Sequence, residues 1–286
     1  MKKFIIIIVL FFELFIMIYS KELIKEFTLT INICLYSLMP TMFFQIFFST
    51  ILINTNLTNY IPNKICSFFN ISKNELLIVL LSIFSGYPNN IKLLKESKNE
   101  YLNYSTNYVN PLFLIGTVGS VYLNNMRIAI IILISHILSN IIMLYILKNN
   151  YTYNEYKKEY KNNLYSYSLN NTIKTLSIIF SNLLLISLLI TFIKVVFPTS
   201  SIYNSFILGI IEFSRGIYEI SKLNISINLK GLLILITITF NSLSIHFQSI
   251  SINNKIKYIK FLLFRILNVL ISIIIYFIII FIYTSL

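Results

Sequence analysis

Long apolar segments decide what this chain can fold into. The segments Arg127–Leu147 and Thr172–Phe197 are each long enough for a helix to cross a bilayer, which takes about 20 mostly apolar residues. Hydrophobic residues make up 57% of the 286 residues and charged residues only 12%. Soluble domains are about one quarter charged. No series of strand-length segments with alternating polarity is present, as a transmembrane β-barrel would need. The sequence therefore predicts an all-α, polytopic integral membrane protein.

The first two apolar segments each contain a feature that interrupts them. Phe4–Tyr19 follows Lys2 and Lys3, and no small-residue cleavage site comes after it, so we expect an uncleaved first helix with a cytoplasmic N-terminus. Glu13 within it is either a functional carboxylate or a group that faces the helix bundle. Phe27–Ile53 contains Pro40, which removes a backbone hydrogen bond and predicts a kink or a break.

The stretch from Ser85 to Gly119 indicates discontinuous helices. Its flanking apolar pieces, Leu76–Phe84 and Leu112–Leu123, are too short to span a bilayer, and each adjoins Gly and Pro, which stop and restart helices. Charged residues lie between the two pieces. Short apolar segments interrupted around charge are typical of the broken helices that form the binding sites of transporters.

Two expected helix starts in this stretch are candidates for binding an anion. Pro88 suits the first turn of a helix that Ser85 would cap, and Asn110-Pro111 starts another helix in the same way. Their free N–H groups, with Lys92 one turn into the first helix, would suit a small dicarboxylate. The alternative is a surface hairpin whose lysines are solvated. Residues expected on the same helix face as Lys92 are Lys95, Glu96 and Asn99.

Polar residues recur in later segments. Ser205–Leu223 is amphipathic, and its Glu212 and Arg215 are spaced to pair, either as a structural ion pair or for function. Asn241–Gln248 contains His246 and Gln248, which either hold helices together or bind a ligand. The same two interpretations apply to a polar stripe on Arg127–Leu147, formed by Ser135, His136, Ser139 and Asn140.

The basic residues predict a topology. The net charge is +13, but the basic residues are scattered or lie at helix ends, which favours the positive-inside rule over nucleic-acid binding. Counting them gives seven crossings in a single membrane domain, residues 1–286. Glu75–Leu123 and Ser205–Gln248 then cross in opposite directions, which predicts an inverted repeat. Its halves are about 27–147 and 172–286, joined by a cytoplasmic polar loop, 148–171.

The sequence lacks the common signatures of enzymes. It has no Gly-rich phosphate loop, no His-Glu-x-x-His helix and no paired-Cys motif. The two histidines exclude a multi-His metal site, and the two cysteines have no metal-ligand spacing. We therefore expect no enzyme activity, no metal and no cofactor.

An ordered set of short motifs resembles the YlbJ-type sporulation integral membrane proteins, in the nucleoside-recognition or Gate-domain group. The motifs are Pro40, Ser85-Gly86-Tyr87-Pro88 with Lys92, Asn110-Pro111-Leu112-Phe113 with Gly116 and Gly119, Gly209 with Glu212 and Gly216, Ser244-Ile245-His246 with Gln248, and Arg265. The chain departs from the family at Asn90 and Ile91, which replace Gly and Ala, and at Asn241–Leu243, which replaces a Gly-rich approach. It is also shorter than typical members.

The resemblance implies a transporter of spore-forming bacteria that exports dipicolinate from the mother cell across the outer forespore membrane, with a fold similar to concentrative nucleoside transporters. The implied partners are membrane lipid, a small anionic substrate and a coupling ion, without nucleic acid. Alternatives are a non-transporting assembly or scaffold protein of the sporulation membrane, and nucleoside-type transport. Expected substrate-binding residues are Ser85, Gly86, Pro88, Lys92, Asn110, Pro111, Glu212, Ser244, His246 and Gln248. Expected structural residues are Pro40, Gly116, Gly119, Gly216 and Arg265, with Gly116 and Gly119 packed closely against a neighbouring helix.

Overall fold

The computed structural model describes residues 2–95, 97, 99–148, 163–197 and 201–285. It is 84% helical and has no strand within those ranges, so the all-α prediction is confirmed. The first half contains α1 (Lys2–Ile18), α2 (Ser20–Ile33), the π-helical turn η1 (Cys34–Leu38), α3 (Met39–Ile53), the 3-10 helix η2 (Asn56–Tyr60), α4 (Asn63–Phe69), α5 (Lys73–Ser85), α6 (Asn89–Leu94), α7 (Leu102–Ser105), the π-helix η3 (Phe113–Tyr122) and α8 (Met126–Ile146). The second half contains α9 (Leu164–Val196), α10 (Ile202–Ile211), α11 (Phe213–Lys222), α12 (Ile227–Phe240), α13 (Leu243–Ile252) and α14 (Tyr258–Ser285).

Within the described residues, five helical segments are long and apolar enough to cross a membrane, which indicates a multi-pass membrane protein. They are Ser20–Ile53, Met126–Ile146, Leu164–Val196, Ile227–Ile252 and Tyr258–Tyr283. The pair α4–α5, bent by 85°, would make a sixth. The count is below the seven crossings expected. The first expected crossing, α1 with 17 residues, is not among these five segments.

The N-terminal third differs from expectation in two ways. Pro40 does not break its segment, because the helix continues from Ser20 to Ile53 and only the turn before Pro40 widens into the π-helical η1. Such a turn accommodates the lost backbone hydrogen bond without ending the helix. Glu13 does not face the helix bundle, because it is exposed on the surface of α1. That helix touches α9 through rings such as Phe15, which contacts Phe192 at 5.5 Å between centroids.

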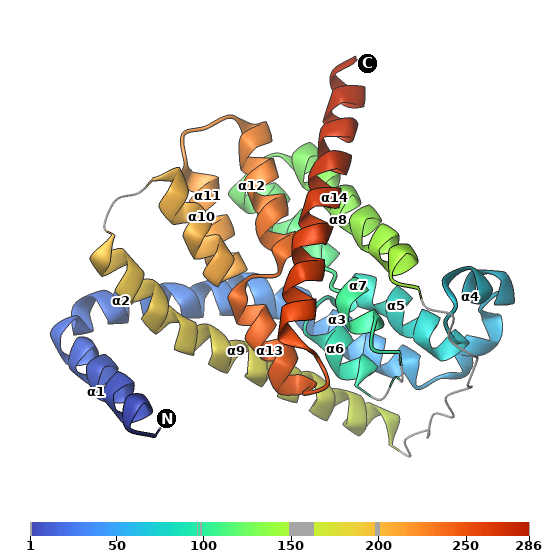
Figure 1. Ribbon diagram of the computed structural model, residues 1–286, viewed down its shortest axis with the longest axis horizontal. Coiled ribbons are helices and arrows are strands. Elements are labelled where there is room, and N and C mark those ends of the chain that lie inside the picture. Colours follow the sequence, from blue (N-terminus) through green and yellow to red (C-terminus); the bar gives the residue numbers. More distant parts are fainter. Residues whose placement is uncertain (1, 96, 98, 149–162, 198–200, 286) are drawn as a thin grey trace.

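The helix α9 begins earlier than the sequence suggests. Residues 164–171, expected in the polar loop 148–171, form its first two turns, while 149–162 lie outside the described residues. The Asn171 amide donates to Thr50 Oγ1 at 2.9 Å, which fixes this polar end to α3. In Figure 1, α9 (olive) crosses the molecule beside α2 and α3, whereas α12 and α14 run roughly upright.

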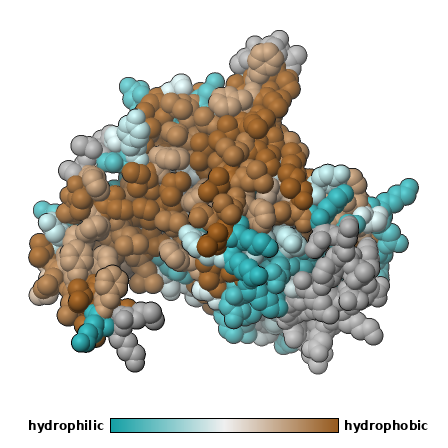
Figure 2. Space-filling model, in the orientation of Figure 1, coloured by the Kyte–Doolittle hydropathy of each residue, from teal (hydrophilic) through white to brown (hydrophobic). Residues whose placement is uncertain are grey.

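The main core joins most of the long helices. Buried side chains from η1, α3, η3, α8, α9, α11 and α12 form one continuous hydrophobic cluster, which also includes Tyr87 and Ile245. The outer surface is apolar as well. Figure 2 shows hydrophobic residues covering the face that α10, α12 and α14 present, as expected for contact with membrane lipid. Hydrophilic residues gather at the lower right of this view, around the end where α6 and the α13–α14 connection lie in Figure 1.

The chain reverses at Glu212, so that Ser205–Leu223 forms two helices packed together instead of one. A side chain on Gly216 of α11 would overlap the Cα of Gly209 on α10. Residues seven apart can meet this closely only if the chain turns back between them. The expected structural role of Gly216 therefore has a direct cause. Gly119 also packs closely, since its Cβ would lie 2.7 Å from Ala129 Cβ on α8.

The expectation of close packing is wrong for Gly116. A Cβ there would meet only Leu112 Cδ1, at 3.9 Å, and Leu112 lies one turn earlier on the same segment. The two glycines at positions 116 and 119 therefore differ, although their sequence context is the same.

Gly216→Ala should lower the free energy of unfolding by about 1–3 kcal/mol, because the added methyl group must push α10 and α11 apart. Gly116→Ala is the matched control and should be neutral or stabilising, since its methyl group has space and glycine weakens a helix. Thermal unfolding of both variants in detergent measures the difference. Equal melting temperatures would contradict the close α10–α11 contact.

Candidate functional site

Two loops cross next to the end of α5. The backbone N–H of Tyr87 donates to the carbonyl oxygen of Tyr108 at 2.9 Å. Gly86 has a φ of +69°, and a Cβ on it would lie 2.9 Å from the backbone nitrogen of Asn110. Glycine is thus required by both conformation and space. The structure brings together Gly86 and Asn110, two of the expected substrate-binding residues.

Asn110 and Pro111 start a helix, as predicted. The Asn110 side-chain oxygen accepts from the backbone N–H groups of Leu112, at 2.8 Å, and Phe113, at 3.2 Å. Its amide nitrogen donates to the carbonyl oxygen of Thr41 at 3.1 Å. Asn110 therefore uses both ends of its side chain to cap one helix and to hold it against α3.

The predicted cap by Ser85 is wrong. Ser85 is the last residue of α5, and its buried hydroxyl has no hydrogen-bond partner among the described residues. The helix α6 follows Pro88 directly and has only six residues. It ends before Lys95, so the longer face expected to run on through Glu96 and Asn99 does not form, and Glu96 itself lies outside the described residues.

Lys92 is half-buried and contacts α9. Its ammonium group donates to Thr175 Oγ1 at 3.0 Å and to the carbonyl oxygen of Asn171 at 3.3 Å. Burial, with a smaller effect of Lys174, lowers the pKa of Lys92. Lys92 also borders a pocket of about 90 Å³ together with Glu75 and Tyr167. These contacts exclude the alternative in which Lys92 is a fully solvated surface lysine. The binding of a solute by Lys92 stays a prediction.

The helix direction changes again between α12 and α13. Asn241 and Ser242 have φ values of 67° and 25°, so the helical backbone is interrupted there. Ser244 Oγ lies 2.9 Å from Ser242 Oγ, and His246 Nε2 lies 2.9 Å from the carbonyl oxygen of Phe240. The predicted residue Ser244 thus contacts the Ser242 side chain at the interruption, and His246 contacts the backbone at the end of α12. Gln248 is buried, and neither of its amide atoms has a partner among the described residues.

A set of buried polar side chains shares this lack of partners. Their hydroxyl or amide groups make no hydrogen bond to any described residue, although each such group costs free energy in an apolar interior. Three of the helices that carry them are in contact, since α13 packs against both α6 and α9. The set is Ser85, Tyr87, Asn89, Tyr108, Ser135, Ser168, Asn241, Gln248 and Ser249.

Arg265 is a fully buried cation on the apolar helix α14. It donates to the carbonyl oxygen of Tyr104 and, at 3.5 Å, to Asn140 Oδ1, while its Nε has no partner. No carboxylate in the described ranges forms an ion pair with it. An unpaired charge is expensive inside a membrane protein and is commonly functional. The resemblance gave Arg265 only a structural role.

His136 connects the crossing loops to α8 and α12. Its Nε2 accepts from the backbone N–H of Val109 at 3.0 Å, and its Nδ1 lies 3.0 Å from Thr239 Oγ1. Because Nε2 must be an acceptor here, the ring is neutral and its proton lies on Nδ1. The ring of Tyr108 contacts it edge-on, at 6.3 Å between centroids. The polar stripe on α8 thus faces the protein interior and contacts Arg265 through Asn140.

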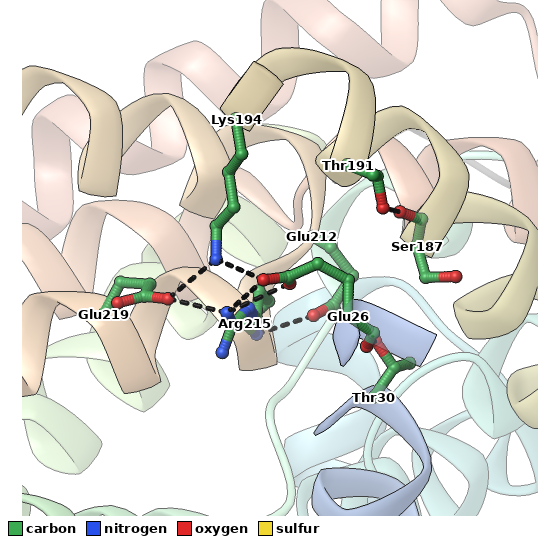
Figure 3. Close-up of polar contacts among 8 residues, drawn as sticks. All are labelled: Glu26, Thr30, Ser187, Thr191, Lys194, Glu212, Arg215 and Glu219. Atoms are coloured by element: carbon green, nitrogen blue, oxygen red, sulfur yellow. Dashed lines mark hydrogen bonds and ion pairs between the residues drawn. The ribbon is translucent and has the colours of Figure 1, made fainter. Parts of the chain in front are cut away.

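Four charged residues form a separate network, shown in Figure 3. Arg215 Nη2 on α11 lies 3.0 Å from Glu26 Oε2 on α2 and 2.7 Å from Glu219 Oε1. Lys194 Nζ on α9 lies 2.7 Å from Glu26 Oε1 and 3.2 Å from Glu219 Oε1. Two carboxylates therefore face two cations, and the network joins three helices with no net charge. Glu26 and Lys194 were not expected to take part. Their charge within or beside apolar segments was the available signal.

The expected pairing of Glu212 with Arg215 takes a different form. Glu212 Oε2 accepts from the backbone N–H of Arg215 at 2.6 Å and from Ser214 Oγ at 2.6 Å, which makes Glu212 the N-cap of α11. The Arg215 guanidinium points to Glu26 and Glu219 instead (Figure 3). The Glu212 carboxylate therefore caps the start of α11, and the Arg215 cation belongs to the ion network.

Comparison with known proteins adds no relative. No protein-family model, no curated protein and no solved structure matches the chain.

Arg215→Met should destabilise the protein by about 3–5 kcal/mol, because it leaves the buried Glu26 and the half-buried Glu219 with Lys194 as their one cation partner among the described residues. Lys222→Met on the same helix is the matched control. Lys222 is exposed, so the same loss of charge should cost less than about 1 kcal/mol. Unfolding in detergent should therefore separate the two variants clearly. If they unfold alike, the network does not hold α2, α9 and α11 together.

Proposed function

We propose that this chain is a membrane transporter of a small anionic solute, and that Arg265 is the cation that meets the solute's negative charge. The observation that carries the proposal is the contrast between two sets of buried charges. Arg215 lies in a network whose charges balance, whereas Arg265 is fully buried with no carboxylate beside it in the described chain. A bound anion would supply the missing charge, and the free Arg265 Nε provides a donor for it.

The surroundings of Arg265 suit the rest of such a solute. Tyr108 and His136 lie on neighbouring segments of the interior, and the Tyr108 hydroxyl has no partner among the described residues. Elsewhere in the interior, unpartnered hydroxyl and amide groups such as those of Ser85, Asn89 and Gln248 would bind carboxylate or ring nitrogen atoms. Buried polar groups without partners are costly in a protein that gains nothing from them. A solute that pairs with them offsets that cost.

The backbone supports a transporter in a second way. The helices stop and restart at Gly86–Pro88 and again before Pro111 in the first half, and at Glu212 and Asn241–Ser242 in the second half. Interrupted helices in both halves of a membrane protein commonly flank its solute site. We propose that these breaks belong to the inverted repeat that the sequence suggests, with half-repeats of about 27–147 and 172–286.

The family resemblance supports a specific solute. It implies dipicolinate, an aromatic dicarboxylate, moved from the mother cell across the outer forespore membrane. A dicarboxylate carries negative charge that would pair with the Arg265 cation, whereas an uncharged nucleoside carries none. A scaffold protein of the same membrane would have no use for an unpaired interior cation. The charge of Arg265 thus favours the anion transporter among the three candidates.

The test is the binding of dipicolinate to purified protein by equilibrium dialysis. Arg265→Gln should weaken binding about tenfold to a hundredfold, because a hydrogen bond to a charged group contributes roughly 1.5–3 kcal/mol. Arg265→Lys should fall in between, since it keeps the charge but loses the planar donor geometry. Arg127→Gln is the matched control: Arg127 is exposed at the start of α8, and its loss should leave affinity unchanged.

Lys92→Met separates the two candidate cations in the same assay. If Arg265 is the main partner of the anion, the loss of Lys92 should reduce affinity less than the loss of Arg265. Equal affinity for dipicolinate in wild type and Arg265→Gln, at matched protein levels, would refute the proposed site. Preference for uridine over dipicolinate would favour nucleoside-type transport, and binding of neither would favour the scaffold.

A further inference from the structure

Glu212 is a buried carboxylate with one oxygen unused. The residue is only 2% exposed, in the turn between α10 and α11. Both of its hydrogen bonds, from Ser214 Oγ and from the Arg215 backbone, go to Oε2. Oε1 has no hydrogen-bond partner among the described residues. A carboxylate that is fully ionised normally accepts bonds on both oxygens when it is buried.

No cation of the described residues forms an ion pair with Glu212, although the nearby charge of Arg215 favours its ionised form. Arg215 on its own helix is committed to Glu26 of α2 and to Glu219, and Lys194 of α9 contacts the same two carboxylates (Figure 3). Lys230 of α12 donates to the carbonyl oxygen of Ser221, at the far end of α11. The remaining titratable groups that face Glu212 are uncharged at neutral pH. They are Cys34 of η1, Tyr87 of the crossing loop, and Tyr122 of η3, which also interacts with Tyr218 of α11.

We propose that Glu212 takes up and releases the proton that drives transport, which makes the protein a proton-coupled transporter. The inference rests on the proposed function, because it names the coupling ion of that transport. In the step itself, a proton from water on one side of the membrane bonds to Oε1 and forms a neutral carboxyl group. Its release to water on the other side regenerates the carboxylate. No other bond forms or breaks.

Two opposing effects allow the proton to exchange. The hydrogen bonds to Oε2 and the N-terminus of α11 stabilise the ionised form, whereas burial with an unused oxygen favours the protonated form. A proton needs only one free oxygen. A metal cation needs a shell of several oxygen ligands, so the single unused oxygen fits a proton better.

The position of Glu212 links protonation to the solute site. The next residue, Phe213, places its ring edge-on against Tyr87, with 5.4 Å between centroids. Tyr87 in turn is bonded through its backbone to Tyr108 at the crossing of the loops. Protonation weakens the helix cap at Glu212, because a neutral carboxyl interacts less with the N-terminus of α11. A shift of that turn therefore reaches the crossing loops directly.

The first experiment uses proteoliposomes containing the full chain, with radiolabelled dipicolinate and with potassium and valinomycin on both sides to hold the voltage at zero. The measured quantity is the accumulation ratio with and without an inward proton gradient of one pH unit. In wild type, one proton per solute should raise accumulation towards about tenfold, since one pH unit is a factor of ten in proton concentration. In Glu212→Gln, the ratio should be the same with and without the gradient.

Matched variants make this result specific. Gln keeps the size of the side chain and an oxygen that can cap α11, and melting temperatures verify that the variant is folded. Glu13→Gln carries the same chemical change at an exposed position on α1, and it should retain the full response to the gradient. A response that survives in Glu212→Gln overturns the proposal, as does a wild type driven by a sodium gradient and not by protons.

A second measurement does not depend on transport. Infrared difference spectra of the purified protein between low and high pH should show the carbonyl band of a buried protonated carboxyl, absent from Glu212→Gln and present in Glu13→Gln. If dipicolinate neither binds nor exchanges in wild type while this band is present, the proposed function fails and the proton site stands. If the solute binds and the band does not depend on Glu212, the coupling inference fails alone.

Discussion

The low polarity of the interior is the constraint on which the rest of this structure depends. Every buried charge there must be paired, neutralised or bound to a ligand. The network of Glu26, Lys194, Arg215 and Glu219 pairs its charges, because two acids and two bases meet within 3.2 Å of one another. Arg265 and Glu212 do not satisfy this requirement within the described chain. The first is a cation without an anion, and the second is an acid with an unused oxygen.

The interrupted helices adjoin both groups, because Glu212 lies in the turn between α10 and α11 and Arg265 donates to the Tyr104 carbonyl oxygen at the end of α7. Each interruption exposes backbone N–H and carbonyl groups that must be satisfied locally, and the chain does this with its own side chains. Asn110 caps the start of η3, Glu212 caps α11, and His246 lies within hydrogen-bond distance of the Phe240 carbonyl at the end of α12. The glycines allow these segments to approach closely, as at Gly86 against Asn110. The resulting interior is rich in polar side chains that have no partner among the described residues.

The sequence predicts the features that depend on local pattern. Apolar length alone locates α8 almost to the residue, and Asn110-Pro111 marks a true helix start because its cap involves only the next three residues. Features that depend on distant partners could not be predicted. Lys194 and Glu26 are 168 positions apart, and nothing in their local sequence indicates that they meet.

The same limit explains the remaining errors. Residues 164–171 look like a polar loop, but they are helical and are held by Thr50 and Lys92 from other parts of the chain. Gly116 resembles Gly119 in the sequence and differs only in what packs against it. For the candidate site, the sequence and the family resemblance name Glu212, Ser244, His246 and Gln248. They assign Arg265 to structure alone, because only the fold shows that no carboxylate of the described residues pairs with it.

The central claim is that the unpartnered polar groups face a solute site reached from water, and cysteine accessibility tests it most directly. Ser85 and Ser82 both lie on α5 and are fully buried, but the Ser82 hydroxyl donates to the Ile78 carbonyl at 2.6 Å, whereas the Ser85 hydroxyl has no partner among the described residues. In a background with Cys34 and Cys66 replaced by alanine, Ser85→Cys should react with a small water-soluble thiol reagent, and dipicolinate should slow the reaction. Ser82→Cys should not react. Equal inertness of the two cysteines, or labelling at position 85 that saturating dipicolinate leaves unchanged, would contradict the account.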